Sequence, residues 1–508
     1  MFVDSGNKDL PDAAFRRSRR SRSSWRTLTA ALPLLLCGMI CCSKKSSPPP
    51  APPVPPPTGD TSKPVLHSDV AFWLTKGDQT VLLQRQNVSL VFGTGSNSNP
   101  TITVDTTRTY QSIDGFGYTM TDGSADLINH LPSSDRAAIL RELFATDSNS
   151  IGVSYLRVSI GASDLSASVF SYDDNGTPSL PDTNLQYFSL ANSEFDLVPV
   201  LKQVLAINPA IRILGSPWSA PLWMKTNNNS VGGTLQPKYF DVYARYLVKY
   251  VQAMKAEGIT IDAITPQNEP MNPNNNPSML LSAGDEAAFI KNNLGPALVA
   301  AGLTTKIIDF DHNCDNPGYP LAVLSDPGAL PYVDGSAFHL YGGDISALSQ
   351  IHSAYPSKNV YFTEQWVGGP SNFPADLDWA VRNLVIGAPR NWSRNVLEWN
   401  LANDPNYQPH TVGGCTNCLG ALTIGTTISR NVSYYIIGHA SKFVRPGSVR
   451  VDSNIFGNLP NVAFLTPDGK KVLIVLNDTG GSLAFNIHFN GRMVTTALDG
   501  GAVGTYMW

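Results

Sequence analysis

The chain of 508 residues is long enough for one large domain and a second, smaller one. Charged residues make up only 15% of it, against ~25% in an average globular protein, and the formal net charge is −4. No basic face is therefore expected, and we predict no nucleic-acid partner. The weakly charged but polar composition is typical of a secreted protein.

Residues 1–42 have the pattern of an export signal. A basic stretch precedes the apolar segment 28–42, which is shorter than the ~20 residues of a membrane-spanning helix. The segment ends in Cys41 and Cys42, a pair that resembles a bacterial lipoprotein cleavage site, and either cysteine could carry the lipid. A plain cleaved signal peptide is the alternative. We therefore expect an exported protein that is extracellular, periplasmic or on the cell surface, with a membrane tether in the lipidated case.

Residues 43–68 are predicted to be a linker. The stretch 48–57 reads PPPAPPVPPP, and eight prolines in ten positions favour a stiff polyproline rod over a helix or sheet. Short strands are expected next, within 71–86, at 87–92 and at 101–104. They precede the main domain.

From residue 113, short apolar runs alternate with helical patterns. Serine at the start of SSDRAAILRELF is a helix start signal, and residues 237–257 repeat apolar side chains at three-to-four spacing before Gly258. Eight such β/α units predict an α/β fold, a (β/α)8 barrel with its active site at the C-terminal ends of the strands. The predicted strands are 113–118, 153–160, 211–217, 261–266, 306–311, 334–339, 359–364 and 396–400.

From Val449 the pattern changes to short runs broken by turn residues, which indicates hairpins. We predict a flanking antiparallel β-sandwich formed from both chain ends. The expected domains are the export segment 1–42, the linker 43–68, the N-terminal sandwich strands 69–112, the catalytic barrel 113–435 and the C-terminal part of the sandwich 436–508.

Two glutamates follow predicted strands in similar settings. Glu269 lies in PQNEP at 266–270, and Glu364 ends the run NVYFTE. They are 95 residues apart, which corresponds to three β/α units of about thirty residues each. This spacing puts them on strands four and seven, whose ends face each other across a barrel mouth. Retaining glycoside hydrolysis needs two such carboxyl groups ~5–5.5 Å apart. Either glutamate alone could cap a strand or pair with a surface arginine, but the matched pair favours catalysis.

Several further segments make the prediction specific. GFGYTMTD at 115–122, LRVSIGASD at 156–164 and GSPWSAPLWMKTN at 215–227, together with the two glutamate segments, resemble glycoside hydrolase family 30, and the likeness covers residues 69–508. This resemblance implies that Glu269 is the acid/base and Glu364 the nucleophile. The side chains that it implies for the sugar pocket are Arg157, Asp164, Trp218, Asn268, His339, Tyr341 and Trp399.

The family resemblance implies a retaining β-glycoside hydrolase acting on β-1,6-glucan, a glucosylceramide-type lipid or another β-glucoside. Its mechanism predicts a raised pKa for Glu269, caused by the nearby charge of Glu364. Trp218 and Trp399 are expected to stack on sugar faces, and Asp122 could be a ligand or a structural cap. The alternative function is a non-catalytic, carbohydrate-binding surface lipoprotein on the same scaffold.

The remaining motifs offer no metal or cofactor. An oxidising compartment permits a Cys415–Cys418 disulfide, which we favour over zinc because no second CxxC is present, and leaves Cys314 buried and free. DFDHNCDNP fails the EF-hand template because Cys314 stands where glycine is needed. Residues 410–424 differ from the corresponding loop of animal glucosylceramidases, so lipid recognition does not carry over. We expect a monomer.

Overall fold

The computed structural model describes residues 66–508. The predicted export segment, with Cys41 and Cys42, and most of the proline-rich linker lie outside the described residues. No helix in residues 66–508 is long and apolar enough to cross a membrane.

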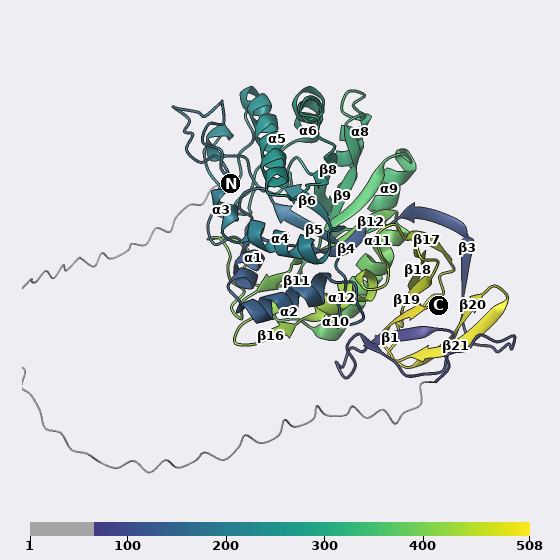
Figure 1. The fold of residues 1–508 in the computed structure, drawn as a ribbon. Helices are drawn as coiled ribbons and strands as arrows, with labels where there is room; N and C mark the ends of the chain where they lie inside the picture. The colour runs from purple at the N-terminus through teal and green to yellow at the C-terminus, as the bar shows by residue number, and fades with distance from the viewer. Residues whose placement is uncertain (1–65) are drawn as a thin grey trace, which may run out of the picture. The chain divides into compact units, whose positions relative to one another are not determined.

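Eight parallel strands close into a barrel, and they match the eight predicted runs (Figure 1). The barrel strands are β4 (Gly115–Thr119), β5 (Tyr155–Ser159), β6 (Arg212–Ser216), β7 (Ala263–Ile264), β8 (Lys306–Cys314), β9 (Val333–Gly343), β10 (Asn359–Glu364) and β12 (Ser393–Asn400). A layer of buried side chains fills the interior: Tyr155, Leu214, Ala263, Ile308, Ala337, Tyr361 and Leu397. Because this layer is packed, the barrel has a solid core at this level and no open channel.

Helices surround the barrel and cover its outer face (Figure 1). The α-helices are α1 (Asp122–Asn129), α2 (Ser133–Phe144), α3 (Ala191–Glu194), α4 (Leu197–Ile207), α5 (Phe240–Ala256), α6 (Ala283–Phe289), α7 (Gly295–Ala300), α8 (Gly318–Ser325), α9 (Ala347–Ala354), α10 (Phe373–Ala380), α11 (Ala388–Arg390) and α12 (Val432–Ser441). The short helical segments are η1 (Leu222–Met224), η2 (Pro237–Tyr239), η3 (Ile290–Leu294) and η4 (Val381–Gly387).

Two helix predictions show what local signals decide. Helix α5 forms where the periodic apolar pattern predicts it, and Gly258 just beyond adopts φ 81°, a left-handed conformation that glycine tolerates. Helix α2 also forms, but the expected serine cap is wrong: Ser133 is the first helical residue, and Pro132 stands at the cap position without a side-chain hydrogen bond.

The β-sandwich that flanks the barrel combines strands from both ends of the described chain. Its strands are β1 (Ala71–Thr75), β2 (Gln84–Arg85), β3 (Thr101–Ser112), β17 (Val449–Ser453), β18 (Asn461–Leu465), β19 (Lys471–Leu476), β20 (Leu483–Phe489), β21 (Arg492–Leu498) and β22 (Val503–Met507). Figure 1 shows the purple N-terminal strands beside the yellow C-terminal ones, and β1 pairs antiparallel with β22. This confirms the predicted sandwich from both chain ends.

Two details of the sandwich differ from expectation. Residues 87–92 form no strand, although the backbone of Leu90 accepts hydrogen bonds from Asp69 and Val70. Strand β20 pairs with β3 in parallel, whereas the other paired strands of this described sheet run antiparallel. Packing against the neighbouring strands, which local alternation does not report, decides both features.

A buried histidine joins the barrel to the sandwich. The two ring nitrogens of His439, on α12, each lie 2.8 Å from a threonine hydroxyl, Thr505 on β22 and Thr75 on β1. Burial lowers the pKa of His439 to about 3, so the ring is neutral and can both donate and accept. One side chain thus ties three distant parts of the sequence together.

Candidate active site

A cavity of about 440 Å³ opens at the C-terminal ends of the barrel strands. Its lining combines carboxylates, aromatic rings and a run of asparagines: Asp164, Trp218, Glu269, Met271, Asn272, Pro273, Asn274, Asn275, His312, Asn313, Tyr341, Glu364, Trp366, Trp399 and Cys418. The barrel therefore brings both predicted glutamates to one cavity, as its topology requires.

The PQNEP segment holds Glu269 in an unusual backbone conformation. Glu269 adopts φ 46°, a region that a residue with a side chain rarely occupies, and its N–H donates to the Asp311 carbonyl at 3.0 Å. The Asn268 N–H donates to the Pro217 carbonyl at 2.8 Å, and the Gln267 amide to the Trp218 carbonyl at 2.7 Å. These bonds fix the carboxylate over the cavity.

Glu364 ends β10 and is held by two donors. The Arg157 guanidinium donates to Glu364 Oε2 at 2.5 Å, and the Tyr341 hydroxyl donates to Oε1 at 2.9 Å. Arg157 is fully buried and also donates to Asn268 Oδ1 at 2.6 Å. The carboxylate is thus oriented by a cation and a phenol at the end of a rigid strand.

His339 lies between the two glutamates. Its Nδ1 is 3.2 Å from Glu269 Oε1 and 3.8 Å from Glu364 Oε1, and these two distances together limit the separation of the oxygens to at most about 7.0 Å. This upper limit on two facing oxygens is compatible with the ~5–5.5 Å separation of the carboxyl groups in retaining enzymes. Its Nε2 lies 3.1 Å from Asp311 Oδ1.

Asp311 is the buried centre of the charge network. Arg157 donates to its Oδ2 at 2.7 Å, and three hydroxyls also donate to it, from Ser216, Thr265 and Thr363. Burial alone would raise the pKa of Asp311, but Arg157 and His339 hold it well below the ordinary value. Asp311 therefore stays ionised and compensates the buried cations.

The pKa values of the two glutamates differ from expectation. Burial raises the pKa of Glu269, but the His339 hydrogen bond, the charges of His339 and His312 and the Asn272 amide together lower it to about 2. The predicted rise is therefore wrong for the unliganded protein. Burial raises the pKa of Glu364 despite the opposing charges of His339 and Arg157.

The proton that was expected on Glu269 lies on His339 instead. Burial lowers the pKa of this histidine, but Glu364, Asp311 and Glu269 together raise it to about 9. At neutral pH the imidazole is protonated and donates from Nδ1 to Glu269 Oε1. The sequence suggested a pair of carboxylates, whereas the structure has a carboxylate–imidazolium pair facing a second carboxylate.

The two predicted tryptophans form one wall of the cavity. Trp218 and Trp399 stack on each other with ring centroids 5.2 Å apart, and the Arg157 guanidinium lies 4.7 Å from the Trp218 ring centroid. Both indoles are almost completely buried. The stacking on sugar that we expected is therefore restricted, because these ring faces already contact protein groups.

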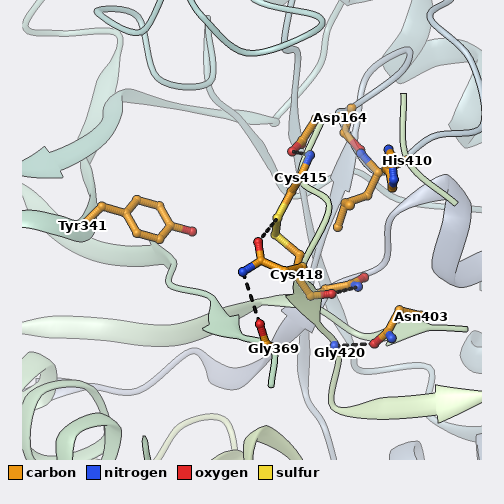
Figure 2. Close-up of a disulfide and its surroundings, with 12 residues drawn as sticks. Asp164, Tyr341, Gly369, Asn403, His410, Cys415, Cys418 and Gly420 are labelled. Atoms are coloured by element: carbon orange, nitrogen blue, oxygen red, sulfur yellow. Dashed lines mark hydrogen bonds between the residues drawn. A yellow bond between two sulfur atoms is a disulfide. The ribbon is translucent and has the colours of Figure 1, made fainter. Parts of the chain in front are cut away.

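Loop 410–420 lies beside Asp164 and contributes Cys418 to the cavity lining. A disulfide joins Cys415 to Cys418, and the Cys415 N–H donates to Asp164 Oδ2 at 3.3 Å (Figure 2). The Thr411 N–H donates to the Asp164 carbonyl at 2.9 Å. Asp164 Oδ1 is buried and has no hydrogen-bond partner among the described residues, so it is available for a ligand hydroxyl.

The same loop contacts the segments that follow β7 and β10, the strands that lead to Glu269 and Glu364. The Thr411 hydroxyl donates to the Asn276 carbonyl at 2.5 Å, beyond β7. The Gly369 N–H donates to the Asn417 carbonyl at 2.8 Å, beyond β10. The Asn417 side-chain amide donates in turn to the Gly369 carbonyl at 3.3 Å (Figure 2). Strand β14 (Cys418–Leu419) also pairs with β11 (Val367–Gly368). The loop is therefore fixed to three sides of the mouth.

Some site residues carried no recognised signal in the sequence. His312 and Trp366 line the cavity, and Asp311 was considered only as part of the rejected EF-hand. A rule that takes the polar residues at the end of every barrel strand would have found Asp311 and His312. Asp122 accepts hydrogen bonds from Ser159 and Ser166 and is absent from the cavity lining, which fits a structural role.

Comparison with known proteins agrees with this geometry. Residues 113–444 match the family model described as the Glycosyl hydrolase family 30 TIM-barrel domain, and residues 447–506 match the Glycosyl hydrolase family 30 beta sandwich domain. The two matches together span the described barrel and the C-terminal strands of the sandwich.

Individual relatives include enzymes with two named activities. An endo-1,6-beta-D-glucanase of Neurospora crassa is 36% identical, covering 80% of this chain and 87% of its own length. The lysosomal acid glucosylceramidase of Mus musculus is 30% identical, covering 80% and 83%. A solved endo-beta1,6-glucanase structure superposes with a TM-score of 0.81 at 35% identity, covering 87% of this chain and 99% of that one.

Proposed function

Because this chain belongs to glycosyl hydrolase family 30 and is a retaining β-glycoside hydrolase, we propose that it cleaves β-1,6-linked glucan, with Glu364 as nucleophile and Glu269 as acid/base. The observation that carries the roles is the placement of both carboxylates within reach of one His339 nitrogen, at the ends of β7 and β10. Arg157 and Tyr341 orient Glu364 for attack.

In the first step Glu364 attacks the anomeric carbon while the bond to the leaving oxygen breaks and Glu269 supplies a proton to that oxygen. In the second step Glu269 removes a proton from water, which displaces Glu364 from the glycosyl ester. Two inversions at the anomeric carbon give net retention.

The proton that Glu269 delivers is held by His339 before substrate binds. The two groups are joined by a 3.2 Å hydrogen bond, so transfer from Nδ1 to Oε1 converts the imidazolium–carboxylate pair into a neutral imidazole and a carboxylic acid. The pair keeps its total charge, and Asp311 stabilises the protonated ring through Nε2. His339, through its high pKa, thus stores the proton that we expected Glu269 to hold through a raised pKa of its own.

Two observations favour β-1,6-glucan over glucosylceramide. Three related endo-1,6-glucanases are 34–36% identical to this chain, and five related glucosylceramidases, four of them named putative, are 28–32% identical. Cys418 of the disulfide-closed loop 410–420 also lines the cavity, where the sequence departs from animal glucosylceramidases. A glucosylceramide-type lipid is the second candidate substrate.

Export is part of the proposal. The basic and apolar pattern of residues 1–42 and the adjacent cysteines support secretion or a lipid tether, with the proline-rich stretch as a spacer. Fractionation of expressing cells tests this, and recovery of the unprocessed chain from the cytoplasm would contradict it.

The direct test is turnover by the purified chain on β-1,6-glucan, glucosylceramide and an aryl β-glucoside under identical conditions. We expect kcat/KM to be higher on β-1,6-glucan than on glucosylceramide. Proton NMR of the earliest product should show the β-anomer. An α-anomer would refute the double displacement, and preferential cleavage of glucosylceramide would refute the substrate assignment.

A further inference from the structure

A second histidine lies beside the proposed acid/base carboxylate. His312 is 7% exposed on β8, and its Nδ1 lies 3.8 Å from Glu269 Oε1. This nitrogen has no hydrogen-bond partner among the described residues. Because a buried polar atom without a partner destabilises the fold, a ligand that pairs with it is favoured.

Glu269, His312 and His339 present three ligand atoms to one point. Their carboxylate oxygen and ring nitrogens all lie within 4.8 Å of one another. Tetrahedral zinc with bonds of ~2.0–2.1 Å separates neighbouring ligand atoms by about 3.4 Å. The two observed distances from Glu269 Oε1, 3.2 Å to His339 and 3.8 Å to His312, lie on either side of that value.

The surroundings of His339 match those of a metal ligand. Its Nε2 lies 3.1 Å from the buried Asp311 carboxylate. Metal-binding histidines commonly donate their second ring N–H to a carboxylate, which orients the ring. Glu269 and His312 also line the 440 Å³ cavity, so an ion can enter from solvent.

We propose that Glu269, His312 and His339 form an inhibitory Zn²⁺ site whose fourth position opens to the substrate cavity. Zinc would replace the proton shared by His339 and Glu269, because one lone pair holds either a proton or the metal. Glu269 would then be unable to protonate a leaving group. The ion is an inhibitor and not a cofactor, and only the loss of turnover rests on the proposed function.

A surface cluster provides a matched control. Asp126, His130 and Asp196 also bring three potential ligand atoms within 4.8 Å of one another, but His130 is exposed and lies outside the lining of the cavity. His130→Asn removes a histidine of similar ligand chemistry without touching the proposed machinery. It should leave turnover and zinc inhibition unchanged.

The test is calorimetric titration of the full chain with ZnCl₂, alongside inhibition of β-1,6-glucan hydrolysis, which needs a protonated leaving group. We expect competitive inhibition that a chelator reverses, and no inhibition by Mg²⁺, which prefers oxygen ligands. His312→Asn should weaken zinc binding by more than the ~10–100-fold lost when an outer-shell partner is removed. Glu269→Gln, which keeps the shape of the side chain, should weaken it similarly, and thermal unfolding checks that both variants are folded.

The outcomes separate the two proposals. Equal zinc affinity in the wild type and His312→Asn, or a loss confined to His130→Asn, would overturn the zinc site. If the chain hydrolysed none of the glucosides, the proposed function would fail, whereas calorimetry would still decide whether His312 and Glu269 bind zinc.

Discussion

Replacing His339 tests whether this histidine supplies the catalytic proton. Asn in its place removes the imidazolium that lowers the pKa of Glu269, while Asp311 keeps Arg157 and three hydroxyl donors. In the wild type, the proton is lost as pH rises through about 9, the pKa of His339. In the variant it is lost at the pKa of Glu269 alone, and burial raises the pKa of catalytic glutamates in general into the ~6–7 range.

The size of the effect follows from these values. At pH 8 a group with a pKa of about 9 is still about 90% protonated, whereas one with a pKa of ~6.5 is about 3% protonated. Activity of His339→Asn on β-1,6-glucan at pH 8 should therefore be about 30-fold below its own optimum. The pH dependence of kcat/KM reports the free enzyme. The pH at which kcat/KM falls on the alkaline side, here called the alkaline limb, should be ~2.5 units lower in the variant than in the wild type.

The assay is the pH profile of kcat/KM on β-1,6-glucan and on an activated aryl β-glucoside. The aryl substrate needs little protonation, so its alkaline limb should change much less. His130→Asn, at an exposed histidine, is the control and should keep the wild-type profile. An unchanged limb on glucan, or an equal change on both substrates, would refute the role of His339 as proton carrier.

Three further predictions concern the carboxylates and the rim loop. Glu364→Gln should abolish turnover on every substrate, measured by product release, because no nucleophile remains. Glu269→Gln should slow glucan hydrolysis by ~10²–10⁴-fold and activated aryl glucosides far less, and added azide should yield a β-glucosyl azide; an α-azide would contradict the glycosyl ester. Replacing both Cys415 and Cys418 by serine should raise KM more than it lowers kcat, because the loop then holds Asp164 less firmly. The same double replacement in an Asp164→Asn background is the control. If it raised KM there by the same factor as in the wild type, the loop would not act through this carboxylate.

Local patterns in the sequence were sufficient for the architecture. Alternation of short apolar runs with helical stretches predicted all eight barrel strands, since the period of apolar residues reflects which face of an element is buried. The ends of those strands then identified Glu269 and Glu364, because parallel strands bring their carboxyl ends to one face of a barrel. The sandwich from both chain ends was predictable for the same reason, although the parallel β3–β20 pair was not.

Only the tertiary structure decided the electrostatics of the site. Glu269 and His339 are 70 residues apart, yet their 3.2 Å contact reverses the expected direction of the Glu269 pKa shift. The sequence could identify Asp311 and His312 as strand-end residues, but the buried ionised state of Asp311 and the unpaired nitrogen of His312 became recognisable only once burial and distances were known. The physical reason is that a pKa depends on burial and on charges a few ångströms away, whatever their position in the chain. Sequence periodicity records which face of an element is buried and carries no information about those distances.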